Sequence, residues 1–498
     1  MVRRSRLLGR HERETETPNP EGGGDAMPAL GVRRLPRLSQ SHRILRDLRS
    51  LSWDRRTFVR FGIVAAVCYV AWVTEQNFGR WYDFFDMKIY HGAVVWWSGG
   101  GELYEYIAPD TTLGFTYPPF AALLMLPMAA LTPSAAGLFN LLFGLTALGF
   151  VLTALLVPVA DRCGWPRWMT VAVALPLFAA IEPVRETLGF GQVNLLLFAL
   201  IMADMVALRR GWRWAGVGIG IATAIKLTPA LFIVYFLVSR QWRAALTAVG
   251  ATLAATAAAY LIVPHESTAY FGSVLWQTER VGAADMTPNQ SLAGLLSRLY
   301  DTTTAPSLLW IAFTLVLLAV GLTRAAAAHA EGDELIAFTL VGLTANVVSP
   351  ISWTHHLVWV VPAVIALGDQ ALRRRAAGRG LAARGRSTPG LREPIWFPAL
   401  VGTRHGGAAV ALYLLFLISP IWPYEHQLPG VSHYADGLFG MLAENSLAIA
   451  LIALVAALPS RPGAEPAFGN LTTARIPLAR PTAAAPRRDT PVAANADR

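Results

Sequence analysis

Charged side chains are scarce in this sequence. Asp, Glu, Lys and Arg make up 15% of its 498 residues, whereas they make up about 25% of an average soluble protein. Hydrophobic residues make up 54%, and the mean hydropathy is +0.43. Most apolar stretches run for about 15 to 25 residues, the length at which a helix crosses a bilayer. The alternating pattern of a membrane β-barrel is missing. We therefore expect an all-α polytopic membrane protein with about 10 to 13 transmembrane helices.

Cysteine and lysine are also rare. The two cysteines, Cys68 and Cys163, give neither a disulfide framework nor a metal-ligand spacing. Lys88 and Lys226 are the only lysines beside 40 arginines. No P-loop, dinucleotide fingerprint, kinase motif set or serine nucleophile elbow occurs, so nothing supports a soluble nucleotide-using enzyme. The net charge of +10 lies mainly in short loops and at the two ends, where it signals topology rather than a nucleic-acid partner.

The distribution of charge divides the chain into three parts. Residues 1–56 are rich in Arg, Pro and Gly and are predicted to form a disordered cytoplasmic arm that touches anionic membrane lipid. Residues 57–458 are predicted to form the transmembrane catalytic domain. Residues 459–498 are rich in Ala, Pro and Arg and are predicted to be a disordered cytoplasmic tail. By the positive-inside rule, both termini are cytoplasmic and loops 74–118, 264–306 and 422–437 lie outside.

Two apolar segments are predicted to deviate from simple spans. Residues 120–131 are short for a span, so we expect a re-entrant or interfacial segment there, although a reading with three crossings over 119–160 stays open. Residues 215–238 have basic turns at both ends, which predicts two half-helices that meet near Lys226–Pro229. We also expect residues 182–194 to be an outer loop, residues 373–392 a basic cytoplasmic loop, and residues 88–97 a short interfacial helix.

A long polar and aromatic loop over residues 81–120 is the strongest candidate site. A loop of this kind between membrane segments is more typical of a site than of a spacer. Asp86 lies there among aromatic residues such as Tyr90, and a partly desolvated carboxylate can act as a general base. An exposed Asp is otherwise most often a solvated charge. Asp83, three residues earlier, is a competing candidate, so an exchange of roles stays open.

Basic residues near helix breaks are candidates for binding a phosphate. A lysine in a membrane segment can extend its ammonium to the interface. Lys226 instead lies at the predicted break, and its compact ammonium suits a phosphate. His355 and His356 form an adjacent pair in a Ser, Pro and Thr break, and intramembrane ionisable residues mark sites by default. A zinc site at this pair is disfavoured because the i, i+4 spacing and a nearby Glu are missing. Arg280 and Arg185 are weaker candidates.

Amides at the entrances to helices are candidates for sugar hydroxyls. Gln192 and Asn194 form one pair, and Asn289 and Gln290 form another. Helix capping is an equally good explanation for both pairs.

Six segments between about residues 60 and 370, in order, together resemble one family, glycosyltransferase family 87. They are DMKIYHGA, GFTYPPFAALLMLP, GQVNLLLFALIMADM, GVGIGIATAIKLTPALFIVYFLVSRQWRAA, NQSLAGLLSRL and SPISWTHH. The residues before and after this region show no such match.

The resemblance implies a membrane mannosyltransferase of the GT-C fold, in the plasma membrane, with its active site on the outer face. Its donor would be polyprenyl-phosphate mannose. Its acceptor would be a mannose hydroxyl on a lipid glycan such as a phosphatidylinositol mannoside, lipomannan or lipoarabinomannan, and the link formed would be α-(1→2). The family's essential Asp falls on Asp86, and its His motif falls on His355 and His356.

The implied reaction is a single inverting displacement that requires no nucleotide and no obligatory metal. Asp86 would act as the base, and Lys226, His355, His356 and Arg280 would bind the donor phosphate. Asp83, Tyr90, Gln192, Asn194, Asn289 and Gln290 would contact the acceptor or the sugars. One alternative is an enzyme that transfers another sugar such as arabinofuranose. The other is a transporter or flippase of a lipid-linked sugar, because broken helices with buried charges also suit transport.

Overall fold

The computed structural model describes residues 54–80, 82–387, 402–422 and 437–461. Most of the predicted arm and tail, and most of the predicted outer loop 422–437, lie outside these residues. Within them every regular element is helical, and pairing between extended segments is limited to the isolated bridges Ile107–Gly114 and Asn289–Trp353. The prediction of an all-α fold is therefore confirmed for the described part of the chain.

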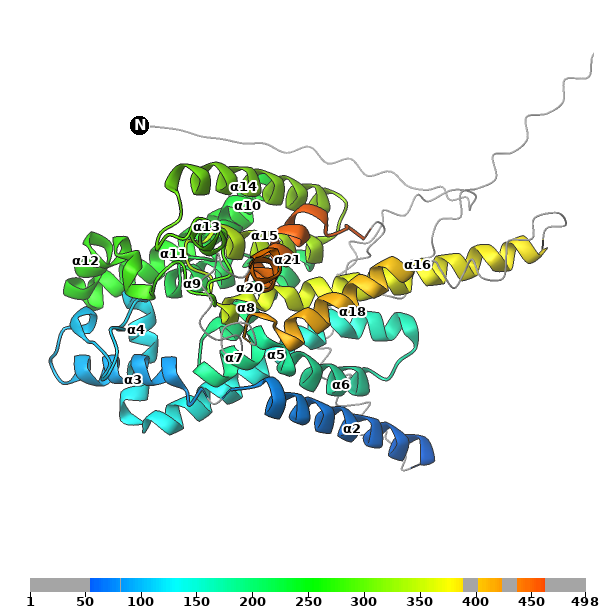
Figure 1. Ribbon diagram of the computed structural model, residues 1–498, viewed down its shortest axis with the longest axis horizontal. Coiled ribbons are helices and arrows are strands. Elements are labelled where there is room, and N and C mark those ends of the chain that lie inside the picture. Colours follow the sequence, from blue (N-terminus) through cyan, green and yellow to red (C-terminus); the bar gives the residue numbers. More distant parts are fainter. Residues whose placement is uncertain (1–53, 81, 388–401, 423–436, 462–498) are drawn as a thin grey trace, which may run out of the picture.

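The helices occur in the following order along the chain (Figure 1). They are α2 (Arg55–Phe78), α3 (Phe85–Ser98), η1 (Leu103–Glu105), α4 (Pro119–Met125), η2 (Leu126–Ala130), α5 (Pro133–Cys163), α6 (Arg167–Ala180), α7 (Glu182–Phe190), α8 (Asn194–Arg209), α9 (Val217–Ile225), α10 (Ala230–Val238), α11 (Trp242–Ile262), α12 (Pro264–Gly272), η3 (Val274–Trp276), η4 (Thr278–Val281), α13 (Leu292–Leu299), α14 (Ser307–Ala330), α15 (Glu334–Val348), η5 (Thr354–Trp359), α16 (Val360–Ser387), α18 (Thr403–Ile418), α20 (Gly437–Glu444) and α21 (Ser446–Ala457).

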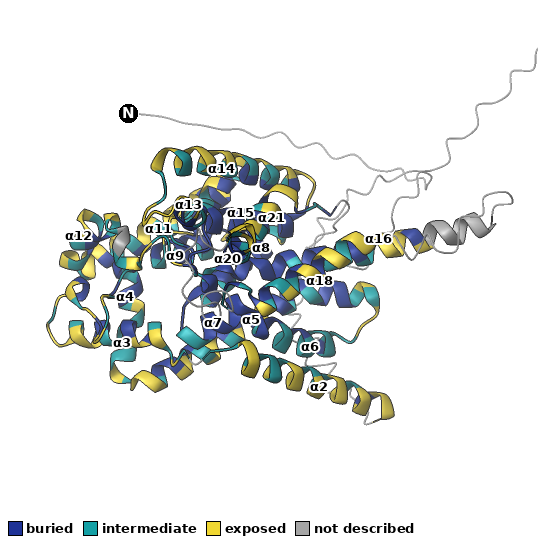
Figure 2. Ribbon diagram, viewed as in Figure 1, coloured by how far each residue is buried: buried dark blue, intermediate teal, exposed yellow. Residues whose placement is uncertain are grey.

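Five helical stretches among the described residues are long and apolar enough to cross a membrane, and seven qualify if two bent pairs each count as one span. Helices α2, α11 and α14 are largely exposed, which suits contact with lipid (Figure 2), whereas α15 lies in the interior and α5 is about half buried. The number is lower than the predicted 10 to 13 because several apolar segments, including α4 with η2, α15 and α18, form helices shorter than about 20 residues.

The predicted break between two half-helices is confirmed. Helix α9 ends at Ile225 and α10 begins at Ala230. Between them Lys226 is extended, with φ −150° and ψ 130°. Pro229 explains part of the break, because proline has no N–H to donate and disfavours a helical residue before it. The break removes Lys226 from both helices and turns its side chain toward the cavity described below.

Two predicted loops are instead helical. Residues 182–190 form α7, which bends by 76° from α6 and is almost wholly buried. The prediction of a loop over 182–194 was wrong because its many polar side chains are paired inside the protein rather than solvated. The predicted basic loop 373–392 was also wrong over most of its length, because α16 continues to Ser387. Arg and Ala, which dominate this stretch, are good helix formers.

A tight turn fixes the position of α3, which covers the predicted helix 88–97. Asp83 and Phe84 adopt left-handed φ values of 48° and 51°, and the N–H of Phe84 donates to the carbonyl of Gly189 at 3.0 Å. Gly191, at φ +74°, lies so close to α3 that a Cβ there would be 2.5 Å from the Cβ of Met87. Only glycine permits this approach, which brings the start of α8 against Asp86.

A buried ionic cluster ties the opposite end of α5 to the C-terminal part of the chain. Asp369 accepts hydrogen bonds from Arg162, Arg373 and Arg461, and Arg461 also pairs with Asp333 at 2.6 Å. Arg162 lies 25 residues along α5 from Gly137, which contacts Phe84, and this separation corresponds to about 38 Å of helix. The charged pairs thus stabilise the end of the bundle that is remote from Asp86.

Candidate functional site

A cavity of about 1050 Å³ opens where the helix breaks and the loops after α3 and α12 meet. Asp86 and Tyr90 of α3 line one side, and Lys226 and the pair His355–His356 line another. Other lining residues come from the segments 110–118, 280–288 and 349–354 and from Trp422. Residues that are far apart in the sequence and that were predicted to act together therefore share one cavity.

The Asp86 carboxylate is held by a network of amide and phenol groups. Gln192 donates from Nε2 to Oδ2 of Asp86 at 2.6 Å and to the Tyr90 hydroxyl at 2.8 Å. The Tyr117 hydroxyl donates to Oε1 of Gln192 at 2.9 Å and lies 3.1 Å from the Tyr90 hydroxyl. Asn140 fixes the backbone carbonyl of Gln192 at 3.2 Å. The amide of Gln192 thus has a single orientation, in which its N–H groups face Asp86 and the Tyr90 hydroxyl.

Burial raises the pKa of Asp86 to about 6. The cause is desolvation, because the carboxylate loses water that would stabilise its charge. The hydrogen bond from Gln192 and the positive charge of Lys226 both act in the opposite direction and lower the pKa. The balance leaves Asp86 ionised at neutral pH but with the basicity that a general base needs.

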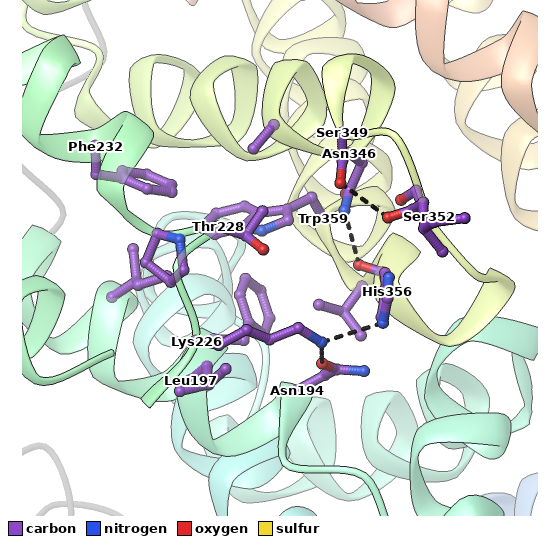
Figure 3. Close-up of a pocket in the computed structure, with 16 residues that line it drawn as sticks. Asn194, Leu197, Lys226, Thr228, Phe232, Asn346, Ser349, Ser352, His356 and Trp359 are labelled. Atoms are coloured by element: carbon purple, nitrogen blue, oxygen red, sulfur yellow. Dashed lines mark hydrogen bonds between the residues drawn. The ribbon is translucent and has the colours of Figure 1, made fainter. Parts of the chain in front are cut away.

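The Lys226 side chain points toward both Asn194 and His356, beside a smaller pocket that all three residues line (Figure 3). Nζ of Lys226 lies 3.2 Å from Oδ1 of Asn194 and 3.1 Å from Nε2 of His356. The backbone N–H of Trp353 donates to Nδ1 of His356 at 3.2 Å, so in a neutral ring the proton is on Nε2. Two N–H donors then lie within hydrogen-bond distance of each other without an acceptor between them, and an anion oxygen beside the pair would accept from both.

His355 is held through its backbone and keeps a ring nitrogen unpaired. Its carbonyl accepts hydrogen bonds from Thr187 and from Asn194, both at 2.9 Å. Its ring packs edge-on against Phe190, with centroids 5.3 Å apart, and Nε2 is buried without a hydrogen-bond partner among the described residues. Within those residues no group of three His, Cys, Asp or Glu side chains lies close enough to hold a metal ion.

The two remaining charged candidates lie differently. Arg280 lines the cavity, and its guanidinium donates to the carbonyl of Tyr104 and to Gln277 at 3.3 Å. Asp83 does not line the cavity. Its side chain is exposed and forms an ion pair with Lys88. The left-handed turn at residues 83 and 84 separates the two carboxylates, so only Asp86 faces Lys226 and the histidines.

Asn289 and Gln290 are fully buried and do not line the cavity. Asn289 donates to the carbonyls of Ala284 and Pro350 and accepts from two backbone N–H groups. Gln290 joins Thr287 to residues 444 and 448 in the same way. This placement is at odds with a sugar contact, because every amide hydrogen already has a backbone acceptor. The pair instead fixes the wall formed by residues 349–352.

Two contributors to the site were not singled out from the sequence. Tyr117 holds Gln192, and the motif TYPP could have indicated it, because a residue before proline is extended and its side chain is fixed in place. Glu186 accepts hydrogen bonds from Thr354 and, at 3.1 Å, from Tyr82. It holds the segment that carries both histidines, but its position inside an expected loop gave no signal.

Replacing Gln192 by Leu should raise the pKa of Asp86 above its value of about 6. The Gln192 N–H stabilises the ionised carboxylate, so its loss favours the protonated form. The measurement is a pH titration of the carboxyl infrared band, taken as a difference against Asp86→Asn. Tyr90→Phe is the matched control, because it removes the other acceptor of the same amide nitrogen and keeps its bond to Asp86. An unchanged pKa in Gln192→Leu, or an equal shift in the control, would contradict this network.

Comparison with known proteins places these features in a family. The family model described as glycosyltransferase family 87 matches residues 115–350. A polyprenol-phosphate-mannose-dependent alpha-(1-2)-phosphatidylinositol mannoside mannosyltransferase of Mycobacterium tuberculosis is 35% identical over 326 residues, which cover 62% of this chain and 75% of the relative. The protein of the same description in Mycolicibacterium smegmatis is 31% identical over 366 residues, 69% of this chain and 82% of the relative.

A solved structure is also similar, at a lower level. It is that of ArnT from Cupriavidus metallidurans bound to undecaprenyl phosphate, with 16% identity over 82% of this chain and 78% of ArnT, and a TM-score of 0.35. A likeness at that score carries no argument about this site. The two mannosyltransferases, in contrast, are aligned over three quarters or more of their length. On that similarity, the chain belongs to glycosyltransferase family 87.

Proposed function

We propose that this membrane glycosyltransferase transfers mannose from polyprenyl-phosphate mannose to a mannose hydroxyl of a phosphatidylinositol mannoside and forms an α-(1→2) link. The donor, the link and the acceptor follow from the descriptions of the two mycobacterial relatives. The observation that carries the proposal is the cavity that Asp86 lines together with a lysine and two histidines, while its other lining carboxylate, Asp110, is exposed. One base and one set of phosphate donors are what a single displacement requires.

In the proposed reaction Asp86 accepts the proton of the acceptor hydroxyl. The hydroxyl oxygen forms a bond to the anomeric carbon of mannose as the bond from that carbon to the phosphate oxygen breaks. A β-linked donor then gives an α-linked product with inversion. The proton stays on Asp86, and polyprenyl phosphate departs as an anion. A carboxylate with a pKa of about 6 serves this step at neutral pH. It is ionised before mannose is transferred, and it is basic enough to accept the hydroxyl proton during the transfer.

The donor phosphate is proposed to bind beside Lys226 and His356. The ammonium of Lys226 and the Nε2–H of His356 lie 3.1 Å apart as two donors, and a phosphate oxygen gives both an acceptor. The unpaired Nε2 of His355 lines the same cavity and supplies a third group. These donors act where negative charge develops on the leaving oxygen, so they stabilise the transition state more than the ground state.

The cavity is proposed to face the outside of the plasma membrane, with both chain termini in the cytoplasm. The basic turn after α8 and the acidic loop after α2 support this orientation through the positive-inside rule.

Paired cysteine variants test the orientation in a background that lacks Cys68 and Cys163. A cysteine at Ser98, exposed at the end of α3, should react with an impermeant maleimide in intact cells. A cysteine at Arg213, exposed in the turn after α8, should react only after permeabilisation. The reverse pattern would place the cavity on the cytoplasmic face.

Asp86→Asn should lower the turnover of purified protein by roughly 10²- to 10⁴-fold, the usual contribution of a general base. The measurement is transfer of labelled mannose from polyprenyl-phosphate mannose to a short phosphatidylinositol mannoside. Asp83→Asn is the matched control and should retain activity, because Asp83 pairs with Lys88 outside the cavity. Loss of activity in Asp83→Asn with normal turnover in Asp86→Asn would assign the base to the other carboxylate.

Lys226→Ala should raise the KM for the lipid donor by roughly 10- to 100-fold, which corresponds to the loss of one charge-assisted hydrogen bond. The KM for the acceptor should change much less, because the proposed partner of Lys226 is the donor phosphate. Lys88→Ala removes the other lysine of the chain and is the control. An unchanged donor KM in Lys226→Ala would exclude this lysine from phosphate binding.

A further inference from the structure

A second cavity, of about 440 Å³, lies beside the first and has no part in the reaction proposed above. It is enclosed by α2, α5, α6, α7 and the turn before α3. The lining residues are Ala71, Glu75, Arg80, Tyr82, Asp83, Phe84, Leu141, Pro176, Ala179, Ala180, Arg185, Leu188 and Gly189. The cavity therefore combines apolar walls with two arginines and two carboxylates, a composition that suits the headgroup and upper chains of a lipid.

Arg185 has guanidinium nitrogens in this cavity that lack hydrogen-bond partners among the described residues. Its side chain is 4% exposed. Nη1 donates to the carbonyls of Ala180 at 3.0 Å and Leu417 at 2.9 Å, whereas Nε and Nη2 are buried without a hydrogen-bond partner among the described residues. Buried guanidinium donors are normally paired. Nε and one Nη present the two parallel N–H groups that bind a phosphate or carboxylate, so these two nitrogens indicate an anionic ligand.

The other charged groups around the cavity narrow the class of ligand. Arg80 adds a second cation, held over the Trp422 ring at 3.2 Å from its centroid. Glu75 and Asp83 line the same space, and the buried carboxylates of Glu182 and Glu186 lie on α7 beside Arg185. A simple anion would meet several negative charges here. A phosphodiester that carries hydroxyl groups suits the site better, because hydroxyls donate to carboxylates while the phosphate binds arginine.

The cavity lies at the end of a membrane span. Helix α2 runs beside α6 (Figure 1), and most of its apolar side chains are exposed. It ends at Phe78, two residues before Arg80. In a helix that spans the bilayer, such a position is at the level of the lipid headgroups, where arginine meets phosphate. The apolar residues between α2, α5 and α6 then lie at the depth of the acyl chains.

A thin aromatic partition separates this cavity from the one that holds Asp86. Tyr82 and Phe190 pack with ring centroids 4.4 Å apart. Tyr82 lines the second cavity and Phe190 lines the first. The contact between Arg80, which lines the second cavity, and Trp422, which lines the first, is part of the same partition. A ligand held by Arg185 therefore lies one layer of side chains away from the reaction site.

We propose that the second cavity binds the phosphodiester and the hydroxyl-bearing ring of the acceptor lipid, while its mannose chain extends past Tyr82 and Phe190 to Asp86. Arg185 and Arg80 bind the phosphate, and Glu75 accepts a hydrogen bond from a ring hydroxyl. This assignment rests on the proposed function, because it divides one acceptor between two cavities. It makes Arg185 a residue that selects lipid-linked acceptors over free glycans.

The test compares two acceptors in the full-length protein. One is a phosphatidylinositol mannoside, and the other is a free α-mannoside oligosaccharide without phosphate or lipid. Arg185→Gln should raise the KM for the lipid acceptor by roughly 10- to 100-fold, as expected for a lost charge-assisted contact. Its kcat/KM for the free oligosaccharide should stay at the wild-type value, which also shows that the variant is folded. Equal losses with both acceptors, or no loss with either, would overturn the assignment.

A second variant leaves the hydrogen bonds of Arg185 intact. Ala71→Phe on α2 fills the apolar side of the cavity and should raise the KM for the lipid acceptor alone. Ala66→Phe is the matched control, because Ala66 is an exposed position of the same helix that does not line the cavity. If Ala71→Phe and Ala66→Phe bind and use the lipid acceptor equally well, the cavity does not receive it.

Two further measurements separate the possible outcomes. Binding of the phosphatidylinositol mannoside without donor should weaken in Arg185→Gln. If binding depends on Arg185 but the wild type transfers no mannose, the proposed function fails and the lipid site remains. If added phosphatidylglycerol instead activates transfer to the free oligosaccharide, and only Arg185→Gln loses this activation, then the ligand is bulk anionic phospholipid and the acceptor assignment is overturned.

Discussion

The hydrogen bond from Gln192 to Asp86 is the contact on which the geometry of the site depends. It joins the first turn of α3 to the entrance of α8, and the same amide is held by Tyr90 and Tyr117. Without it, only the positive charge of Lys226 would offset the desolvation that raises the pKa of Asp86. The close approach of Gly191 to α3 makes this bond possible, so a single glycine and a single amide set the position and the basicity of the carboxylate.

The rest of the site follows from the rule that backbone polar groups in a membrane must be satisfied. The helices are interrupted at residues 226–229 and 349–353, and both interruptions line cavities rather than lipid. The second is closed by side chains: Asn289 occupies the backbone groups of residues 350 and 352, and Asn194 and Thr187 occupy the carbonyl of His355 just after it. The amides that looked like sugar ligands in the sequence therefore include several that hold broken helices in place.

The sequence predicted the helical class, the break at Lys226 and the grouping of Asp86, Lys226 and the histidines, because hydropathy and charge report directly on which segments avoid water. The prediction from the sequence was wrong for α7, where a solvated loop was expected but Glu182 and Glu186 are buried. The burial of a polar residue depends on partners that are distant in the chain. Asp83 and Asp86 were equivalent in the sequence for the same reason. Only the left-handed turn at Asp83 and Phe84, a backbone property, directs them to different cavities.

The opposing influences on Asp86 also couple the two substrates of the proposed reaction. The positive charge of Lys226 lowers the pKa of Asp86. When a donor phosphate binds Lys226, its negative charge cancels that effect, and the further loss of water strengthens the desolvation that already dominates. Both changes raise the pKa of Asp86, so the carboxylate becomes a stronger base once the leaving phosphate is bound. Because Asp86 and Lys226 line the same cavity, Asp86 becomes a strong base only in the complex with the donor. In that complex the acceptor hydroxyl is the group from which it takes a proton.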